Sequence, residues 1–235
     1  MPTQPSAPLA KGSSPVRSPG GRRLPVVWLG IGAIVLVAAI IAIIVSSQSD
    51  SKKTAVVTRG NGAKNTVALK ESRPVTVTGK ALPAFEGGTD AAVGRVAPEL
   101  RGSSFDGKPV AVTHDGHPKL VLFVAHWCPH CQREVPLLVK YLHDHPLPSQ
   151  MNLVAVATST SPDQGNYPPS AWLARVRWPT PVLADSSAFA AAQAFGLPAF
   201  PYFVALDSHD KVVGRTSGEI STDEFAKLVA KALKA

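Results

Sequence analysis

The sequence predicts an α/β domain, with helices on both sides of a central sheet, that follows a single transmembrane helix. Residues 119–125 and 151–159 are continuous apolar runs of strand length, which is typical of strands covered on both faces. Between these runs, apolar side chains recur at helical spacing, namely Cys131, Val135, Leu138 and Leu142. Strand, helix and strand in this order indicate a right-handed parallel crossover.

The N-terminus predicts a membrane anchor. Residues 1–25 contain four basic residues, no acidic residue and many Pro, Gly and Ser, so we expect a disordered tail. Residues 26–45 carry no charge, and a helix of this length spans about 30 Å, the thickness of a bilayer core. A buried soluble helix is seldom this long. The apolar region of a signal peptide usually runs only about 7–15 residues, so we expect a retained transmembrane helix.

Charge predicts the orientation of this anchor. By the positive-inside rule the basic tail stays in the cytoplasm, so the rest of a single-pass membrane protein lies outside. The net charge is +8, but the tail holds four of the 24 basic residues and none of the 16 acidic ones, which leaves +4 for the exported part. This mild excess, without a stripe of basic and aromatic residues, argues against a nucleic-acid partner.

The exported part divides into a spacer and a domain. Residues 46–93 are polar and Gly-containing with two short β-like runs, so we expect a spacer with edge strands; residues 94–235 form the compact domain. Short helices are expected over 170–177 and 187–196, then a hairpin of two strands around the turn at 208–210. The final helix begins with the capping-box residues Ser221 and Glu224.

The only two cysteines, Cys128 and Cys131, lie where the first strand ends and the helix begins. A disulfide between them would close a very short loop and stabilise little. Haem attachment needs a histidine where Gln132 stands. Zinc usually takes two separated ligand pairs, and there is no second Cys pair. Histidines could still add zinc ligands, namely His126, His130 and the outlying His114, His117, His143 and His145, and the two sulfurs alone could hold Cu(I).

A reactive pair explains more of these residues. The strand leads Cys128 to the N-terminus of the helix, with Pro129 at the first helical position, where its missing N–H costs nothing. The free N–H groups and the helix dipole there favour an anion, which makes Cys128 the attacking thiolate. Cys131, one turn further along, is shielded and resolves the mixed disulfide. His130 offers the Cys128 sulfur a positive charge or an N–H donor.

These features resemble the thioredoxin superfamily. The motif WCPHC follows a buried strand, and residues 94–112 look like the lead-in hairpin of the membrane-anchored, TlpA-like thioredoxins of the bacterial cell envelope. Pro136 matches the kink proline of the thioredoxin active-site helix. The resemblance covers residues 94–235. It implies a thioredoxin fold and a thiol–disulfide oxidoreductase that needs no cofactor beyond its redox-active disulfide.

The resemblance also implies roles for other residues. Pro201 matches a cis-proline that faces the cysteines and would expose the backbone of Phe200 to an extended substrate segment. Trp127 joins these two residues as a substrate-binding side chain. Thioredoxin has a buried aspartate where Leu122 stands here, so Glu134, which matches an acidic residue under the site in TlpA-like proteins, is the candidate proton acceptor for Cys131.

Together these observations predict a membrane-tethered enzyme that exchanges disulfides with exported proteins and is recycled by a membrane redox partner. The Pro-His dipeptide between the cysteines matches the strong oxidant DsbA, and an exported protein lies where disulfides form. A dithiol oxidase or isomerase is therefore favoured over a TlpA-like reductase, for example one for cytochrome c maturation. A copper-binding or delivery module and an interaction module with incidental cysteines are the alternatives from other classes.

Overall fold

The computed structural model describes residues 56–57 and 67–234. The expected tail and transmembrane helix, residues 1–45, lie outside these residues, and no helix within the described part is long and apolar enough to cross a bilayer. In the expected spacer, β1 (Val56–Val57) pairs antiparallel with β2 (Val67–Ala68).

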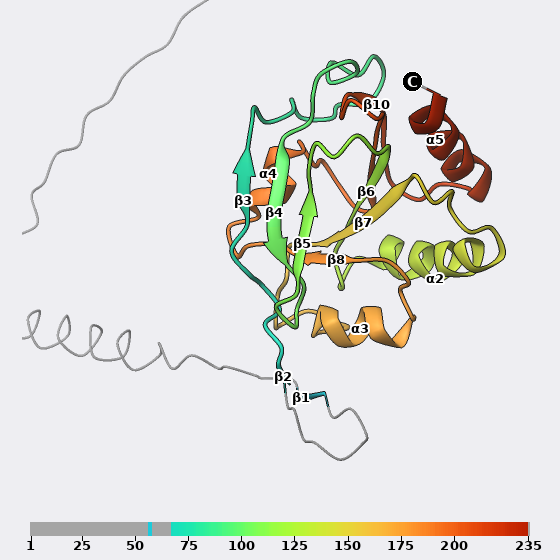
Figure 1. The fold of residues 1–235 in the computed structure, drawn as a ribbon. Coiled ribbons are helices and arrows are strands. Elements are labelled where there is room, and N and C mark those ends of the chain that lie inside the picture. Colours follow the sequence, from blue (N-terminus) through green and yellow to red (C-terminus); the bar gives the residue numbers. More distant parts are fainter. Residues whose placement is uncertain (1–55, 58–66, 235) are drawn as a thin grey trace, which may run out of the picture. The chain divides into compact units, whose positions relative to one another are not determined.

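A five-stranded sheet forms the centre of the domain, with the strand order β10-β9-β6-β7-β8. Strands β6, β7 and β8 run parallel, whereas β9 runs antiparallel to its neighbours β6 and β10 (Figure 1). All six residues of β6 are buried, which confirms the predicted central strand. The strands are β6 (Lys119–Val124), β7 (Asn152–Ala157), β8 (Val182–Ala184), β9 (Tyr202–Leu206) and β10 (Val212–Ser217).

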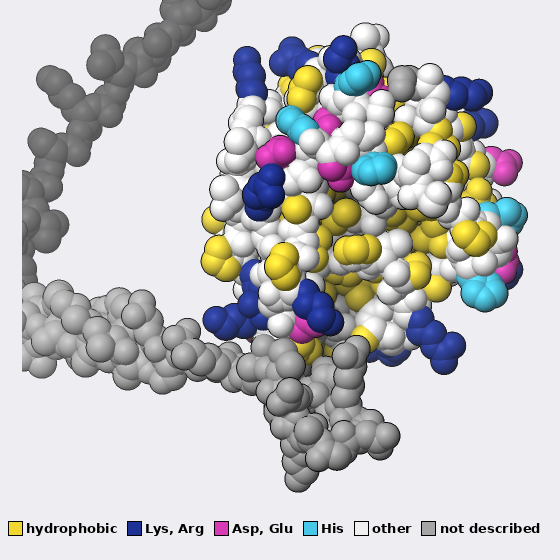
Figure 2. Space-filling model, viewed as in Figure 1, with side chains coloured by type: hydrophobic (Ala, Val, Ile, Leu, Met, Phe, Trp, Pro, Cys, Tyr) yellow, Lys and Arg dark blue, Asp and Glu magenta, His cyan; other side chains and the backbone are white. Residues whose placement is uncertain are grey.

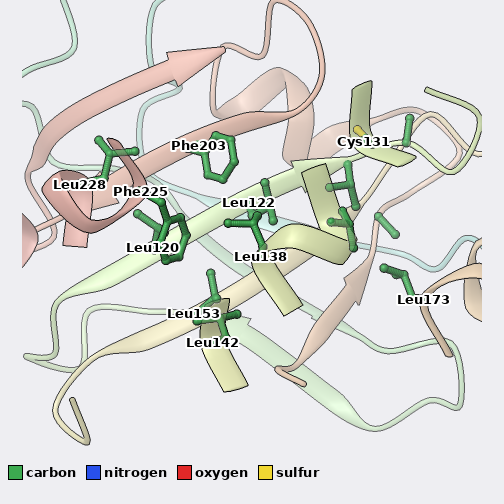
Figure 3. Packing of buried hydrophobic residues seen from close by; sticks show 14 of the residues in the cluster. Leu120, Leu122, Cys131, Leu138, Leu142, Leu153, Leu173, Phe203, Phe225 and Leu228 are labelled. Atoms are coloured by element: carbon green, nitrogen blue, oxygen red, sulfur yellow. The ribbon is translucent and has the colours of Figure 1, made fainter. Parts of the chain in front are cut away.

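The side chains of β6 alternate between two hydrophobic clusters because successive residues of a strand point to opposite faces. Leu120 and Leu122 pack with residues of three helices, and Figure 3 shows them beside Leu138 and Phe225. These helices are α2 (Pro129–Asp144), α3 (Pro169–Arg175) and α5 (Thr222–Lys234). Helix α2 buries the predicted stripe and contains Pro136.

The other face of the sheet is covered by a short helix and a second sheet. Val121 and Phe123 pack in a cluster that includes residues of α4 (Ala190–Ala194). The second sheet has the order β3-β4-β5 and is antiparallel. Its strands are β3 (Thr76–Thr78), β4 (Glu99–Ser103) and β5 (Pro109–Val112). Helices on both faces were predicted correctly. The second sheet, which covers one of these faces together with α4, was not predicted.

The packed region extends N-terminal to the expected boundary at residue 94. Strand β3 pairs with β4, and Leu82 and Ala92 are buried in the core. The fully buried side chain of Arg215 on β10 bonds to this segment: its Nε donates to Asp90 Oδ2 at 2.8 Å and its Nη1 donates to the Pro83 carbonyl at 2.8 Å. Residues 76–93 thus belong to the domain, although their polar composition suggested a spacer.

A hollow of about 470 Å³ lies away from the cysteines. Hydrophobic side chains gather on this face around β5, β7 and β8 (Figure 2). The hollow is lined by β5 and by the segments that lead into β7 and β8, including Val110, Ala111, Leu147, Met151, Pro179 and Pro181. None of the residues predicted for the reactive site lines it.

Candidate active site

Cys128 is the N-cap residue of α2, in an extended conformation, and Pro129 occupies the first turn. The Cys128 carbonyl accepts the N–H of Gln132 at 3.0 Å, so the helix begins where the sequence predicted. Cys128 is 5 % exposed and Cys131 is fully buried, and both are free thiols. Both cysteines are thus buried, and only Cys128 keeps a small exposed fraction.

The predicted substrate-binding residues lie together beside Cys128. The Phe200–Pro201 peptide bond is cis, and the Cys128 thiol donates to the Phe200 carbonyl oxygen, with 3.8 Å between Sγ and O. The Trp127 ring meets the Phe200 ring edge-on, with 5.8 Å between centroids. Residues from the end of β6 and the start of β9, which are far apart in sequence, therefore share one surface at the reactive sulfur.

Two buried groups with raised pKa values lie behind that surface. Burial raises the pKa of the Cys131 thiol well above its ordinary value, and the charges of Cys128 and Glu134 raise it further. Glu134 is 2 % exposed, and burial raises the pKa of its carboxyl group to about 7. The Ile220 N–H donates to Glu134 Oε2 at 3.3 Å and opposes this rise. Leu122 is fully buried at the position where thioredoxin has an aspartate.

His130 bonds to a carboxylate rather than to the sulfur. Its Nδ1 lies 2.6 Å from Glu219 Oε1 and 2.9 Å from Arg133 Nη2, and its side chain is 57 % exposed. Within residues 67–234, the His130 ring makes no hydrogen bond to Cys128 Sγ. The expected N–H donation to the sulfur is therefore not seen, and any influence of His130 on Cys128 acts through its charge.

Arg133 and Glu219 contact His130 at the edge of the site, and the sequence did not predict either contact. Glu219 lies between β10 and α5, and 86 residues separate it from Arg133. No local pattern connects two residues so far apart, so only the fold brings this carboxylate to the first turns of α2.

His126 is a third residue whose role was missed. It is 1 % exposed, its Nδ1 donates to the Gly165 carbonyl at 2.8 Å, and its Nε2 accepts the Ser161 N–H at 3.2 Å. Since both ring nitrogens are used in this way, the ring is neutral. Trp127 Nε1 donates to the Ser159 carbonyl at 2.7 Å, so the two residues before Cys128 together hold the loop 159–165.

We expect His126 to make the stability of the protein pH-dependent. Burial lowers the pKa of His126, against an opposing effect from the Glu71 carboxylate, so the unfolded chain takes up this proton first as the pH falls. The contribution of the neutral His126 ring to the free energy of unfolding is complete above the ordinary histidine pKa of about 6.5 and is lost as the pH falls below this value. His126→Phe is expected to cost about 1–3 kcal/mol at neutral pH, through two lost hydrogen bonds, and to flatten the fall in stability toward acidic pH.

Urea unfolding at a series of pH values measures both effects. His209→Phe is the matched control, because the His209 side chain is exposed and only its backbone N–H makes a hydrogen bond in the described residues, so it is expected to change neither quantity. An unchanged pH dependence in His126→Phe would show that His126 does not titrate with folding.

The Redoxin family model matches residues 78–231. This chain belongs to the Redoxin family. The match begins N-terminal to residue 94, in agreement with the packing of β3. Together with the cysteine pair at the start of α2, family membership makes the protein a thiol–disulfide oxidoreductase with a thioredoxin-like fold.

Solved structures are similar to this chain, and the first of them supports the fold. A putative thiol:disulfide interchange protein DsbE from Chlorobium tepidum is 19% identical, with 60% of this chain and 96% of that chain covered and a TM-score of 0.51. A thioredoxin family protein from Chlorobium tepidum TLS is 24% identical, with 61% and 99% covered and a TM-score of 0.49. StoA from Bacillus subtilis is 16% identical, with 58% and 98% covered and a TM-score of 0.48. Among curated proteins, none matches the sequence.

The cysteine pair has no third metal-ligating neighbour in the described part of the chain. Among residues 56–57 and 67–234, no group of three or more His, Cys, Asp or Glu side chains is placed to hold a metal ion.

Proposed function

We propose that this redoxin oxidises the dithiols of exported proteins to disulfides, outside the membrane to which residues 26–45 anchor it. The observation that carries the proposed direction is the place of Cys128 as N-cap of α2, in a helix whose first turn contains no acidic residue and is followed by Arg133. The Cys128 charge raises the pKa of Arg133, after the larger effect of Glu219, so the guanidinium lies within electrostatic reach of the sulfur.

This environment favours the oxidising direction. The helix N-terminus and a nearby cation both stabilise a thiolate on Cys128. A thiolate exists only in the reduced enzyme, so its stabilisation favours that form and makes the disulfide form the stronger oxidant.

The reaction transfers two electrons from a substrate dithiol to the enzyme disulfide. A substrate thiolate attacks Cys128 Sγ, the Cys128–Cys131 bond breaks, and Cys131 leaves as a thiolate. The second substrate thiolate then attacks the substrate sulfur bound to Cys128 and releases Cys128. The products are a substrate disulfide and the Cys128, Cys131 dithiol, and the two protons lost by the substrate balance the two that the reduced pair can take up.

Proton transfer to Cys131 is the role we assign to Glu134. The raised pKa of the Cys131 thiol means that the leaving sulfur requires a proton, and the buried position of this sulfur limits the supply from water. Glu134 lies one helical turn further along α2 and has a pKa of about 7, so it can hold or release a proton near neutral pH.

Substrate binds at the surface formed by Trp127, Phe200 and Pro201. The Phe200 carbonyl oxygen lies against Cys128 Sγ, so an extended substrate segment that pairs with this backbone brings its own sulfur to Cys128. The aromatic rings of Trp127 and Phe200 supply apolar contact beside it. A membrane redox partner then reoxidises the pair through the same surface.

The reduction potential tests the direction. The full chain in detergent is equilibrated with reduced and oxidised glutathione, and the reduced fraction is counted by thiol alkylation. We expect a potential closer to the DsbA value of about −120 mV than to the thioredoxin value of about −270 mV. A value near thioredoxin's would assign the protein as a TlpA-like reductase. Absence of exchange with tight Cu(I) binding by both thiols would support the copper module instead.

The membrane side is tested separately. A membrane-impermeant thiol reagent, applied to intact cells after reduction, is expected to label Cys128. Labelling only after cell lysis would place the domain in the cytoplasm.

A further inference from the structure

A carboxylate from the C-terminal part of the chain joins two basic side chains of α2. Arg133 Nε donates to Glu219 Oε1 at 3.0 Å and to Oε2 at 3.2 Å, and Arg133 Nη2 also donates to Oε1. His130 Nδ1 lies 2.6 Å from the same Oε1. We call these three residues, His130, Arg133 and Glu219, the rim cluster.

The hydrogen bonds of the rim cluster limit where the proton of the His130 ring lies. A carboxylate oxygen only accepts, so the contact to Glu219 requires a proton on Nδ1, whereas the Arg133 Nη2 contact at 2.9 Å requires a bare Nδ1. Nδ1 can satisfy one of these partners at a time. Arg133 bonds both Glu219 oxygens in either case, so donation by Nδ1 leaves every member of the cluster with a partner.

The cluster also determines the charge near Cys128. Bonds from Arg133 and then from His130 lower the pKa of the Glu219 carboxyl group to about 2, so it is ionised at every pH at which the protein works. The positive charge of Arg133 near the Cys128 sulfur is thus offset by one negative charge from Glu219.

We infer that Glu219 is a positioning residue of the exchange reaction, which sets the reduction potential of the cysteine pair by holding Arg133 and His130 and by partly neutralising the charge of Arg133. This inference rests on the proposed disulfide exchange at Cys128. It adds a residue outside the C-x-x-C motif, from the loop between β10 and α5, to those that determine the chemistry.

Glu219→Gln in the full chain is the test. Gln keeps a carbonyl oxygen for Arg133 but removes the negative charge, so the Cys128 thiolate gains stability. Exposed ion pairs contribute little free energy, so the equilibrium constant with glutathione is expected to move only about two- to fivefold toward reduced enzyme. At about 30 mV per tenfold, this is a more oxidising potential by about 10–20 mV. Arg133→Gln is expected to move it the opposite way, and the double variant to return close to the wild type.

Two controls separate charge from structure. Asp144 at the far end of α2 bonds Lys140 Nζ at 2.6 Å and His143 Nδ1 at 3.0 Å, so Asp144→Asn makes a chemically similar change about 24 Å away along the helix. It is expected to leave the potential unchanged. Glu219→Asp keeps the charge and is expected to keep the wild-type potential, whereas a shift as large as that of Glu219→Gln would assign the effect to packing and overturn the inference.

The failure of this inference differs from failure of the proposed function. If Glu219→Gln exchanges disulfides at the wild-type potential, or becomes more reducing, Glu219 does not set the potential and the enzyme assignment stands. If the wild-type protein itself shows no exchange, the proposed function fails first. The ultraviolet absorbance of the thiolate gives a second readout, and in Glu219→Gln it is expected to appear at a lower pH.

Discussion

The Cys128→Ser protein is expected to lose thiol–disulfide exchange by about 10³-fold or more, in the range observed when an enzyme loses its nucleophile. A serine hydroxyl forms no mixed disulfide, and the remaining thiol of Cys131 is fully buried with a raised pKa, so it cannot take over the attack. The measurement is the rate of disulfide exchange with a model peptide. Rapid exchange by Cys128→Ser would reverse the roles proposed for the two cysteines.

The Cys131→Ala protein tests the second role. It cannot form the Cys128–Cys131 disulfide, but its Cys128 thiolate can still attack a disulfide of an exported protein, which is the reverse of the proposed oxidation. No Cys131 thiol is then present to break the mixed disulfide, so covalent complexes with exported proteins are expected to accumulate on non-reducing gels. The double variant Cys128→Ser, Cys131→Ala is the matched control and is expected to trap nothing. The trapped chains, identified by mass spectrometry, are the substrates.

Glu134→Gln is expected to stabilise the protein at alkaline pH. The folded state raises the pKa of Glu134 from an ordinary 4.5 to about 7, because the carboxylate is buried. The folded protein therefore binds this proton more tightly than the unfolded chain. The stabilising effect of this bound proton is complete below pH 4.5 and is lost as the pH rises through 7. Relative to the wild type, the variant is expected to be unchanged near pH 4 and more stable by about 2–3 kcal/mol near pH 9.

The same variant is expected to slow the chemistry. Removing a positioned proton acceptor typically costs about 10²-fold or more, so we expect resolution of the mixed disulfide by Cys131 to slow by about this factor. Its pH profile is expected to lose the inflection near pH 7 that the pKa of Glu134 predicts for the wild type. Stopped-flow measurement across this range checks both. Glu86→Gln is the control, since the Glu86 side chain is exposed and is not among the groups that shift the pKa of Glu134.

An inflection that persists in Glu134→Gln would place the proton acceptor elsewhere. A stability gain without a change in the rate would make Glu134 a buried carboxylate with no part in the reaction. These outcomes separate the two effects, because one depends on the folded ground state and the other on the attack by Cys131.

The strands and helices that bury continuous or periodic apolar residues were predictable. Strand β6 is apolar from Leu120 to Val124 because the sheet is covered on both faces, and α2 shows its buried stripe in the spacing of Cys131, Val135 and Leu138. Each of these patterns lies within one segment of the chain and indicates which side chains of that segment are buried. The place of Cys128 at the start of α2 follows from the same local information.

The polar contacts were not predictable in the same way. Asp90 and Arg215 are 125 residues apart and pair within the core, so nothing near either residue in the sequence indicates that the segment around Asp90 belongs to the domain. Glu219 and His130 are 89 residues apart. The sequence therefore predicted a contact between His130 and the Cys128 sulfur, because nothing near His130 indicates the carboxylate that bonds it.

The sequence by itself determined the chemistry: two cysteines at a strand-to-helix junction, a leucine in place of the familiar aspartate, and a buried helical stripe beneath them. The groups that surround Cys128 and Cys131 are known only from the tertiary structure. It brought the Phe200 carbonyl to 3.8 Å from Cys128 Sγ and Glu219 to 2.6 Å from His130. The physical reason is that burial patterns repeat locally along the chain, whereas hydrogen bonds and charges act between groups that the fold alone brings together.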